Sequence, residues 1–225
     1  MPCLIFDLDG TLVDSLPGIA GSLNRTLAAH GMPVHSCPAI RAFIGGGLRL
    51  LVEHAAPAGT APSLIDALVV HYKQDYDLTW ASNSFVYDGI HEMLGGLQES
   101  GFQLGVLSNK IHDFTVVMTR AVFPHIHFVQ ILGQREGIPQ KPHAAGAIEL
   151  ARAFGVAPGQ CVLIGDSTID LETAANAGMP AVAVAWGYHD SERLIDAGAT
   201  RLIRHPSELP GMLAELSDRR PQATD

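Results

Sequence analysis

The 225-residue chain is 47% hydrophobic and 16% charged, and its net charge is −9 at pH 7. A sequence of this length and apolar content can bury a sizeable core, which excludes an intrinsically disordered protein. The acidic excess, with lysine at positions 73, 110 and 141 only, argues against a nucleic acid or an anionic membrane surface as a partner, because both bind clustered cations.

The sequence also predicts a soluble cytoplasmic protein. It has neither a basic leader nor a long apolar segment at its N-terminus, and no apolar run reaches the roughly 18 residues that a membrane span needs. Cys3, Cys37 and Cys161 are scattered and odd in number, which favours unpaired thiols in a reducing compartment.

Residues 3–6 form a short apolar run that predicts a buried strand and stops at an aspartate. Asp7 and Asp9 lie two residues apart, so both carboxylates can turn toward one point where the strand ends. Crowded carboxylates raise one another's pKa unless a cation relieves them. The alternative is a polar turn in which the aspartates cap the next helix. Gly10 and Thr11, with a permissive backbone and a hydroxyl donor at the same corner, favour the functional interpretation.

The next segment carries helical patterns. Apolar residues recur at helical spacing within 16–30, and the segments 37–56 and 62–80 predict two or three further helices. No strand signal interrupts this block. We therefore expect residues 15–85 to form an α-helical cap domain inserted directly after the first strand.

From Tyr87 onward, helices alternate with short apolar strands. The expected strands are 102–107, 127–132, 161–165, 181–185 and 200–203. The expected helices are 90–100, 113–123, 142–154, one that follows residues 166–170 and ends at 177, and two more within 191–216. Such alternation implies right-handed crossovers, which favours an α/β fold with a Rossmann-like, doubly wound parallel sheet. The predicted core domain comprises residues 1–14 and 86–218, and residues 219–225 are expected to form a loose C-terminal tail.

Polar residues follow several of these strands. Asp7, Ser108 and Asp166 each stand where a strand ends, and ligands of open parallel sheets bind outside the carboxyl ends of the strands. Lys141 precedes a helix that returns along the sheet, which puts it at the same edge. Carboxylate oxygens are ligands that Mg²⁺ prefers, while a hydroxyl and an ammonium suit phosphate oxygens. The combination predicts a site for phosphoryl transfer.

The motifs resemble those of the haloacid dehalogenase superfamily. The residues that carry the resemblance are Asp-Leu-Asp-Gly-Thr at 7–11, Ser-Asn-Lys at 108–110, Lys-Pro at 141–142 and Gly-Asp-Ser-Thr-Ile-Asp at 165–170. They occur in that superfamily's order, the resemblance spans roughly residues 3 to 190, and the helical block is similar to its small helical cap. Softer features, such as Leu-Val-Asp-Ser at 12–15, look like those of phosphoglycolate-phosphatase-like enzymes.

The resemblance implies a role for each motif residue. Asp7 would be the nucleophile that forms an aspartyl-phosphate, Asp9 the general acid and base, and Lys141 the catalytic cation that holds nucleophile and phosphate together. The other implied roles are phosphate binding by Ser108, Asn109 and Thr11, Mg²⁺ binding by Asp7, Asp166 and the backbone carbonyl of Asp9, and orientation of the site by Asp170.

The glycines at 45–47 are either a helix break or a cap loop that meets the substrate, and we favour the loop. Gly46 in this loop and Arg49 just after it are the expected substrate contacts of the cap, because a guanidinium suits an anion.

The predicted function is a Mg²⁺-dependent phosphatase that hydrolyses a small phosphorylated metabolite, with phosphoglycolate as the leading substrate, acting as a monomer or homodimer. The alternatives are a phosphomutase of the β-phosphoglucomutase type and a non-catalytic phosphate-binding protein.

Overall fold

The computed structural model describes residues 3–218, and its centre is a six-stranded parallel sheet with the order β5-β4-β1-β6-β7-β8. The strands are β1 (Cys3–Phe6), β4 (Gln103–Ile111), β5 (Phe128–Gln134), β6 (Cys161–Gly165), β7 (Ala181–Val184) and β8 (Leu202–Ile203). The strand β1 lies between β4 and β6, so its carboxyl end stands in the middle of the sheet.

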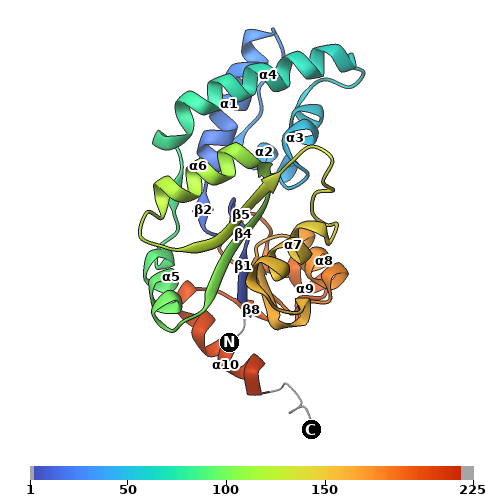
Figure 1. Cartoon of the computed structure of the whole chain (residues 1–225). Coiled ribbons are helices and arrows are strands. Elements are labelled where there is room, and N and C mark those ends of the chain that lie inside the picture. The colour runs from blue at the N-terminus through green and yellow to red at the C-terminus, as the bar shows by residue number, and fades with distance from the viewer. Residues whose placement is uncertain (1–2, 219–225) are drawn as a thin grey trace.

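The pleat of β1 sends alternate side chains to the two faces of the sheet. Leu4 and Phe6 belong to one apolar cluster, whereas Cys3 and Ile5 belong to the other. Helices cover both faces, with α5 on one side and α7 and α8 on the other (Figure 1). The helices of this part are α5 (Ile90–Glu99), α6 (His112–Val122), α7 (Ala145–Phe154), α8 (Thr168–Ala177), α9 (Ser191–Asp196) and α10 (Leu209–Asp218). The predicted doubly wound α/β fold is therefore confirmed.

A helical segment lies beyond the carboxyl end of β1 (Figure 1). It contains α1 (Leu16–Ala29), α2 (Cys37–Phe43), α3 (Leu48–Ala55) and α4 (Pro62–Thr79). The chain leaves through β2 (Val13–Asp14) and returns through β3 (Phe85–Val86), and these two strands pair antiparallel. We call residues 15–85 the insert, and its action as a separate cap domain stays a prediction.

Several boundaries differ from the expected ones. The helix α7 begins at Ala145, not at Pro142, because the backbone N–H and C=O of Lys141 both bond to the side chain of Asn109 and hold the preceding residues in a turn. The short β2–β3 pair was not predicted, since two-residue strands carry no periodic signal. The expected tail, residues 219–225, lies outside the described residues.

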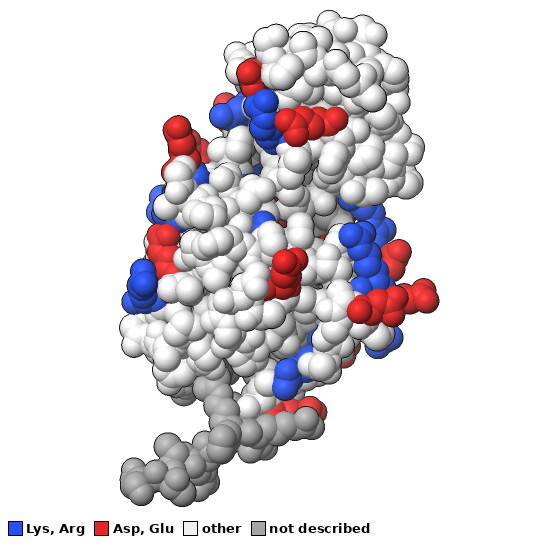
Figure 2. All heavy atoms as spheres, turned by 90° about the vertical axis from the view of Figure 1, so that its right-hand side faces the viewer, with Lys and Arg blue, Asp and Glu red and all other residues white. Residues whose placement is uncertain are grey.

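The charged residues on the face shown in Figure 2 are scattered, and both signs occur together. The upper end of this face, which belongs to the insert, carries few charges. Within residues 3–218, no helix combines the length and the apolar character needed to cross a membrane.

Candidate active site

Asp7 is buried at the carboxyl end of β1. Its backbone N–H donates to the carbonyl of Ile164 in β6 at 2.9 Å, which fixes the residue between two strands. Its carboxylate Oδ1 lies 2.9 Å from Lys141 Nζ and accepts a hydrogen bond from the N–H of Leu8 at 2.7 Å. Burial raises the pKa of Asp7 to about 8, despite the opposing effect of Lys141.

Lys141 reaches this point from the turn before α7. Its Nζ donates to Asp170 Oδ1 at 2.7 Å as well as contacting Asp7. Burial alone would lower the pKa of Lys141, but the carboxylates of Asp170 and Asp7 outweigh it and the net shift is upward. The ammonium therefore keeps its charge between two carboxylates.

Asp166 follows β6 and is also buried. Its Oδ1 accepts from the hydroxyl of Thr11 at 2.9 Å and its Oδ2 from the N–H of Tyr188 at 2.7 Å, so both oxygens are oriented. Burial, together with the charge of Asp170, raises the pKa of Asp166 to about 7.

Gly10 makes room for Asp166. Its φ is +86°, a conformation that strains other residues, and a Cβ at this position would lie 2.3 Å from Asp166 Oδ2. The first motif and Asp166 therefore approach so closely that only glycine fits between them.

The carboxylate cluster fits a hard divalent cation. Oxygens of Asp7, Asp166 and Asp170 lie within 4.8 Å of one another, and burial raises the pKa of both Asp7 and Asp166 in the protein alone. Asp170 is already committed, because Oδ1 pairs with Lys141 and Oδ2 accepts from the hydroxyl of Ser167 at 2.6 Å. Asp7 and Asp166, which the family resemblance implies as ligands, stay the predicted metal ligands of this cluster.

The carboxylate of Asp9 lies outside this cluster. Its Oδ1 accepts from the Ser15 hydroxyl at 2.5 Å, and both of its oxygens lie 3.2 Å from Lys110 Nζ. The same ammonium donates at 2.8 Å to the hydroxyl of Tyr76 in α4. The side chain of Asp9 is thus held by Ser15 and Lys110 outside the cluster, so only its backbone carbonyl is left for the implied metal contact.

Ser108 and Asn109 occupy the end of β4 and differ in their contacts. The hydroxyl of Ser108 accepts from the N–H of Lys110 at 3.2 Å, which leaves its own hydrogen for a phosphate oxygen. The amide of Asn109 is occupied, because Oδ1 accepts from Lys141 N at 2.8 Å and Nδ2 donates to the carbonyls of Lys141 and Gly45 at 2.9 and 2.8 Å.

A cavity of about 80 Å³ connects these groups with the insert. Its catalytic lining comprises Asp7, Asp9, Ser108, Lys110, Lys141 and Asp166. On the side of the insert, the lining is mostly apolar and aromatic: Ile19, Ile44, Leu48, Leu51, Tyr72 and Tyr76. His189 also lines the cavity, but burial lowers its pKa to about 4, so it carries no charge at neutral pH.

Three expected contacts are not supported by the geometry. Thr11 donates to Asp166 and thereby orients it, and the amide of Asn109, which lines the cavity, is occupied by backbone groups, so phosphate binding by these two side chains is not supported by their contacts and stays a prediction. Arg49 is paired on the surface of the insert with Glu53 at 2.9 Å and Asp66 at 2.6 Å, and it does not line the cavity.

The glycine loop contacts the core, but Gly46, the expected substrate contact, is not among the residues that line the cavity. The carbonyl of Gly46 accepts from Gln140 Nε2 at 2.8 Å, while Gly45 and Gly47 line the cavity. Gly47 has φ +85°, and a Cβ there would lie 2.9 Å from the Gln140 side chain. The loop therefore contacts the core through backbone groups.

Sequence reasoning missed Lys110 and Tyr76. No role of its own was expected for Lys110, yet only 8% of its side chain is exposed. A lysine directly after a motif serine and asparagine was the available signal for Lys110, whereas Tyr76 offered none beyond the apolar pattern of its helix.

Comparison with known proteins places these residues in a family. A family model described as haloacid dehalogenase-like hydrolase matches residues 4–184. The chain is 31% identical over 217 residues to a phosphoglycolate phosphatase of Mesorhizobium japonicum, which covers 95% of each chain. It is 32% identical over 210 residues to a phosphoglycolate phosphatase of Caulobacter vibrioides, covering 92% of this chain and 88% of the relative.

The fold is shared with solved structures as well. A haloacid dehalogenase-like family hydrolase from Streptococcus pneumoniae aligns with a TM-score of 0.84 at 25% identity, covering 95% of this chain and 98% of that one.

Proposed function

Because the chain belongs to the haloacid dehalogenase-like hydrolases and is a phosphatase, we propose that it hydrolyses a small phosphomonoester with Mg²⁺ and through a phosphorylated Asp7. The observation that supports this most directly is the 2.9 Å contact between Asp7 Oδ1 and Lys141 Nζ, next to Asp166 in a buried cluster. Relatives at 31% and 32% identity are named phosphoglycolate phosphatases, and we propose phosphoglycolate as the leading substrate.

Asp7 and Asp166 would hold the metal, together with the backbone carbonyl of Asp9. When bound, Mg²⁺ supplies positive charge that favours the ionised form of Asp7 and reduces its repulsion of a phosphate dianion. Lys141 adds a second positive charge at the same carboxylate. This charge compensation is needed because the net charge of the chain is −9.

The first step would form a bond between a carboxylate oxygen of Asp7 and phosphorus, while the bond between phosphorus and the alcohol oxygen breaks. Asp9 would give its proton to that alcohol oxygen. In the second step Asp9 would take a proton from water, the water oxygen would bond to phosphorus, and the bond from phosphorus to Asp7 would break. Ser108 is the proposed hydrogen-bond donor to the phosphoryl oxygens in both steps.

The insert would exclude bulk water during these steps. Arg41 of α2 donates to the backbone carbonyls of Tyr188 at 2.5 Å and Gly187 at 3.1 Å, so the insert is docked on the core in this conformation. Exchange of substrate and product would require the insert to open, as in other enzymes with closing lids.

The test is steady-state turnover of phosphorylated metabolites with Mg²⁺ by the wild type and by two variants. Asp7→Asn should lose phosphate release, because an amide is a poor nucleophile, while circular dichroism reports an intact fold. Asp9→Asn should bind the same esters and fail to turn them over. Clear hydrolysis by purified Asp7→Asn contradicts the covalent mechanism.

The phosphomutase alternative gives a different product. A mutase would pass the phosphoryl group from Asp7 to a second hydroxyl, so isotopically labelled phosphate would stay in organic form. The apolar lining of the insert favours hydrolysis of a small substrate over transfer between sugar hydroxyls. The non-catalytic alternative has no support, because the chain is a phosphatase.

A further inference from the structure

Lys110 is the cation of the cavity that the proposed steps leave unused. Its Nζ lies 3.2 Å from both oxygens of Asp9 and 2.8 Å from the hydroxyl of Tyr76. An ammonium has three donors, and one carboxylate with one hydroxyl need not occupy all of them. Because Lys110 lines the cavity, a ligand in the cavity can meet it.

The other basic groups near the cavity are committed elsewhere or uncharged. Among the described residues that line it, Lys141 is held by Asp7 and Asp170, and His189 is neutral at neutral pH. Arg49 points to its surface partners. Among these lining residues, Lys110 is therefore the cation that pairs with a single carboxylate, that of Asp9, and that a second anionic group of a substrate can also meet.

On this basis, and resting on the function proposed above, we propose that Lys110 binds a carboxylate on the leaving alcohol and so selects phosphate monoesters of 2-hydroxy acids. The substrate's ester oxygen meets Asp9, and its carboxylate meets the ammonium beside Asp9. Tyr76 holds that ammonium from the side of the insert, so the recognition site is complete only when insert and core are together.

The geometry limits how long the acid is. If the ester oxygen lies about 3 Å from Asp9, the ammonium lies within about 6 Å of that oxygen. A carboxylate on the carbon next to the ester oxygen meets this limit directly. A carboxylate several carbons further along the chain can lie beyond this limit, in a cavity whose lining on the side of the insert is mostly apolar.

The apolar lining on the side of the insert also disfavours binding of sugar phosphates, which carry several hydroxyl groups. A hydroxyl group of a sugar phosphate that lies against Ile19, Leu48 or Leu51 finds no hydrogen-bond partner in those side chains, which is unfavourable. The lining also strengthens the ion pair to Lys110, because removing water lowers the local dielectric constant. Short acidic esters therefore fit better than neutral or sugar esters.

The experiment compares phosphoglycolate with ethyl phosphate, in which a methyl group replaces the carboxylate. The wild type should prefer phosphoglycolate in kcat/KM by about 10- to 100-fold, the effect of one charge-assisted hydrogen bond. Lys110→Met should reduce this ratio to near one, chiefly by raising KM for phosphoglycolate, and Lys110→Arg should restore most of it. The ratio is independent of the fraction of folded enzyme, because both substrates meet the same sample.

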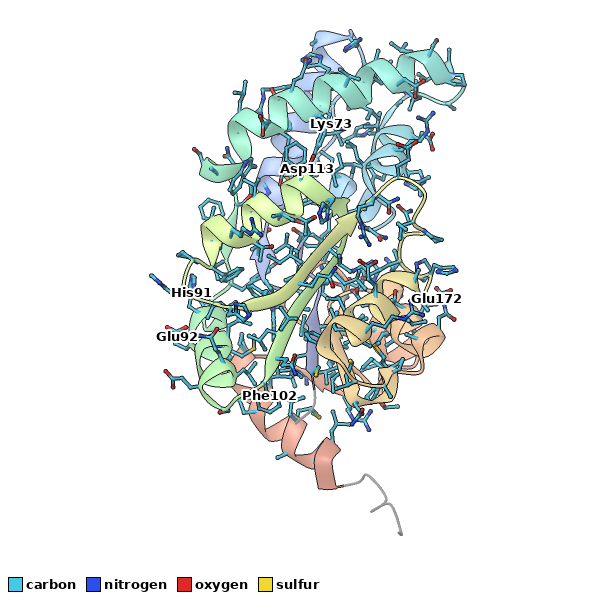
Figure 3. All side chains as sticks on the ribbon, in the orientation of Figure 1. Lys73, His91, Glu92, Phe102, Asp113 and Glu172 are labelled. Carbon is cyan, nitrogen blue, oxygen red and sulfur yellow. The ribbon has the colours of Figure 1, made fainter. Side chains whose placement is uncertain are left out.

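Lys73→Met is the matched control. Lys73 is exposed on α4 (Figure 3), so this variant loses the same charge from the chain without touching the cavity. Its ratio should equal that of the wild type. A Lys110→Met enzyme that keeps the full preference, or a wild type that hydrolyses both esters equally well, overturns the proposal.

A binding measurement covers the case in which Lys110→Met has no turnover. In an Asp7→Asn background, calorimetry should show tighter binding of phosphoglycolate than of ethyl phosphate, and adding Lys110→Met should abolish the difference. An unchanged difference again overturns the proposal. Failure of the underlying function looks different, because the wild type would then release no phosphate from either ester or from p-nitrophenyl phosphate.

Discussion

Replacing Asp7 by asparagine should remove a large part of the pH dependence of stability in the metal-free protein. Burial raises the pKa of this carboxyl from 3.8 to about 8 in the folded state. At a pH between 3.8 and about 8, the folded protein therefore keeps a proton on Asp7 that the unfolded chain has released. The stabilisation is therefore fully present below pH 3.8 and is lost as the pH rises through about 8.

The size of the effect follows from linkage. One additional proton bound by the folded state lowers the free energy of unfolding by about 1.4 kcal/mol for each unit of rising pH. Between pH 5 and pH 7 the Asp7 contribution is thus about 3 kcal/mol, a large share of the total stability of a domain. Saturating Mg²⁺ should suppress this slope, because the cation favours the ionised carboxylate.

The assay is urea unfolding across this pH range, with a chelator or with Mg²⁺, for the wild type and Asp7→Asn. Comparing slopes between the two proteins cancels the histidines and surface carboxylates that titrate in both. If both metal-free proteins show the same slope, Asp7 is ionised throughout and the argument from burial is refuted.

Two further predictions concern neighbouring positions. Gly10→Ala should weaken Mg²⁺ binding by about 10- to 100-fold, because the new Cβ would displace Asp166; calorimetry measures this, and unchanged affinity contradicts the close approach. Arg49→Ala should leave kcat/KM for phosphoglycolate unchanged, because its guanidinium is paired with Glu53 and Asp66; a clear loss of turnover would return Arg49 to the substrate site.

The convergence of the core residues was predictable from local signals. Asp7, Ser108 and Asp166 each follow a short apolar run, and the alternation of helices and strands dictates that such strand ends meet at one edge. The alternation also sufficed for the fold class, since it depends on periodicity that each segment carries alone.

The contacts between core and insert were not predictable in the same way. Lys110 meets Tyr76 across 34 positions and Asp9 across 101, so its role depends on how α4 docks over the sheet. Arg49 was expected at the substrate, but in this structure it pairs with Glu53 and Asp66, and Glu53 one helical turn later was a visible sign of such a surface pair. Which side of α3 faces the core is decided by packing. The glycine-rich loop before α3 does not fix that side, so the direction of the Arg49 side chain could not be predicted from the sequence.

The three hydrogen bonds of Asn109 have a mechanical consequence. Two of them fix the backbone of Lys141 on the sheet, and the third reaches the carbonyl of Gly45 in the insert. If the insert swings away, only the third bond must break, and the lysine stays anchored next to Asp7. The side chain of Asn109 thus touches both parts, while the two bonds that position Lys141 lie entirely within the core.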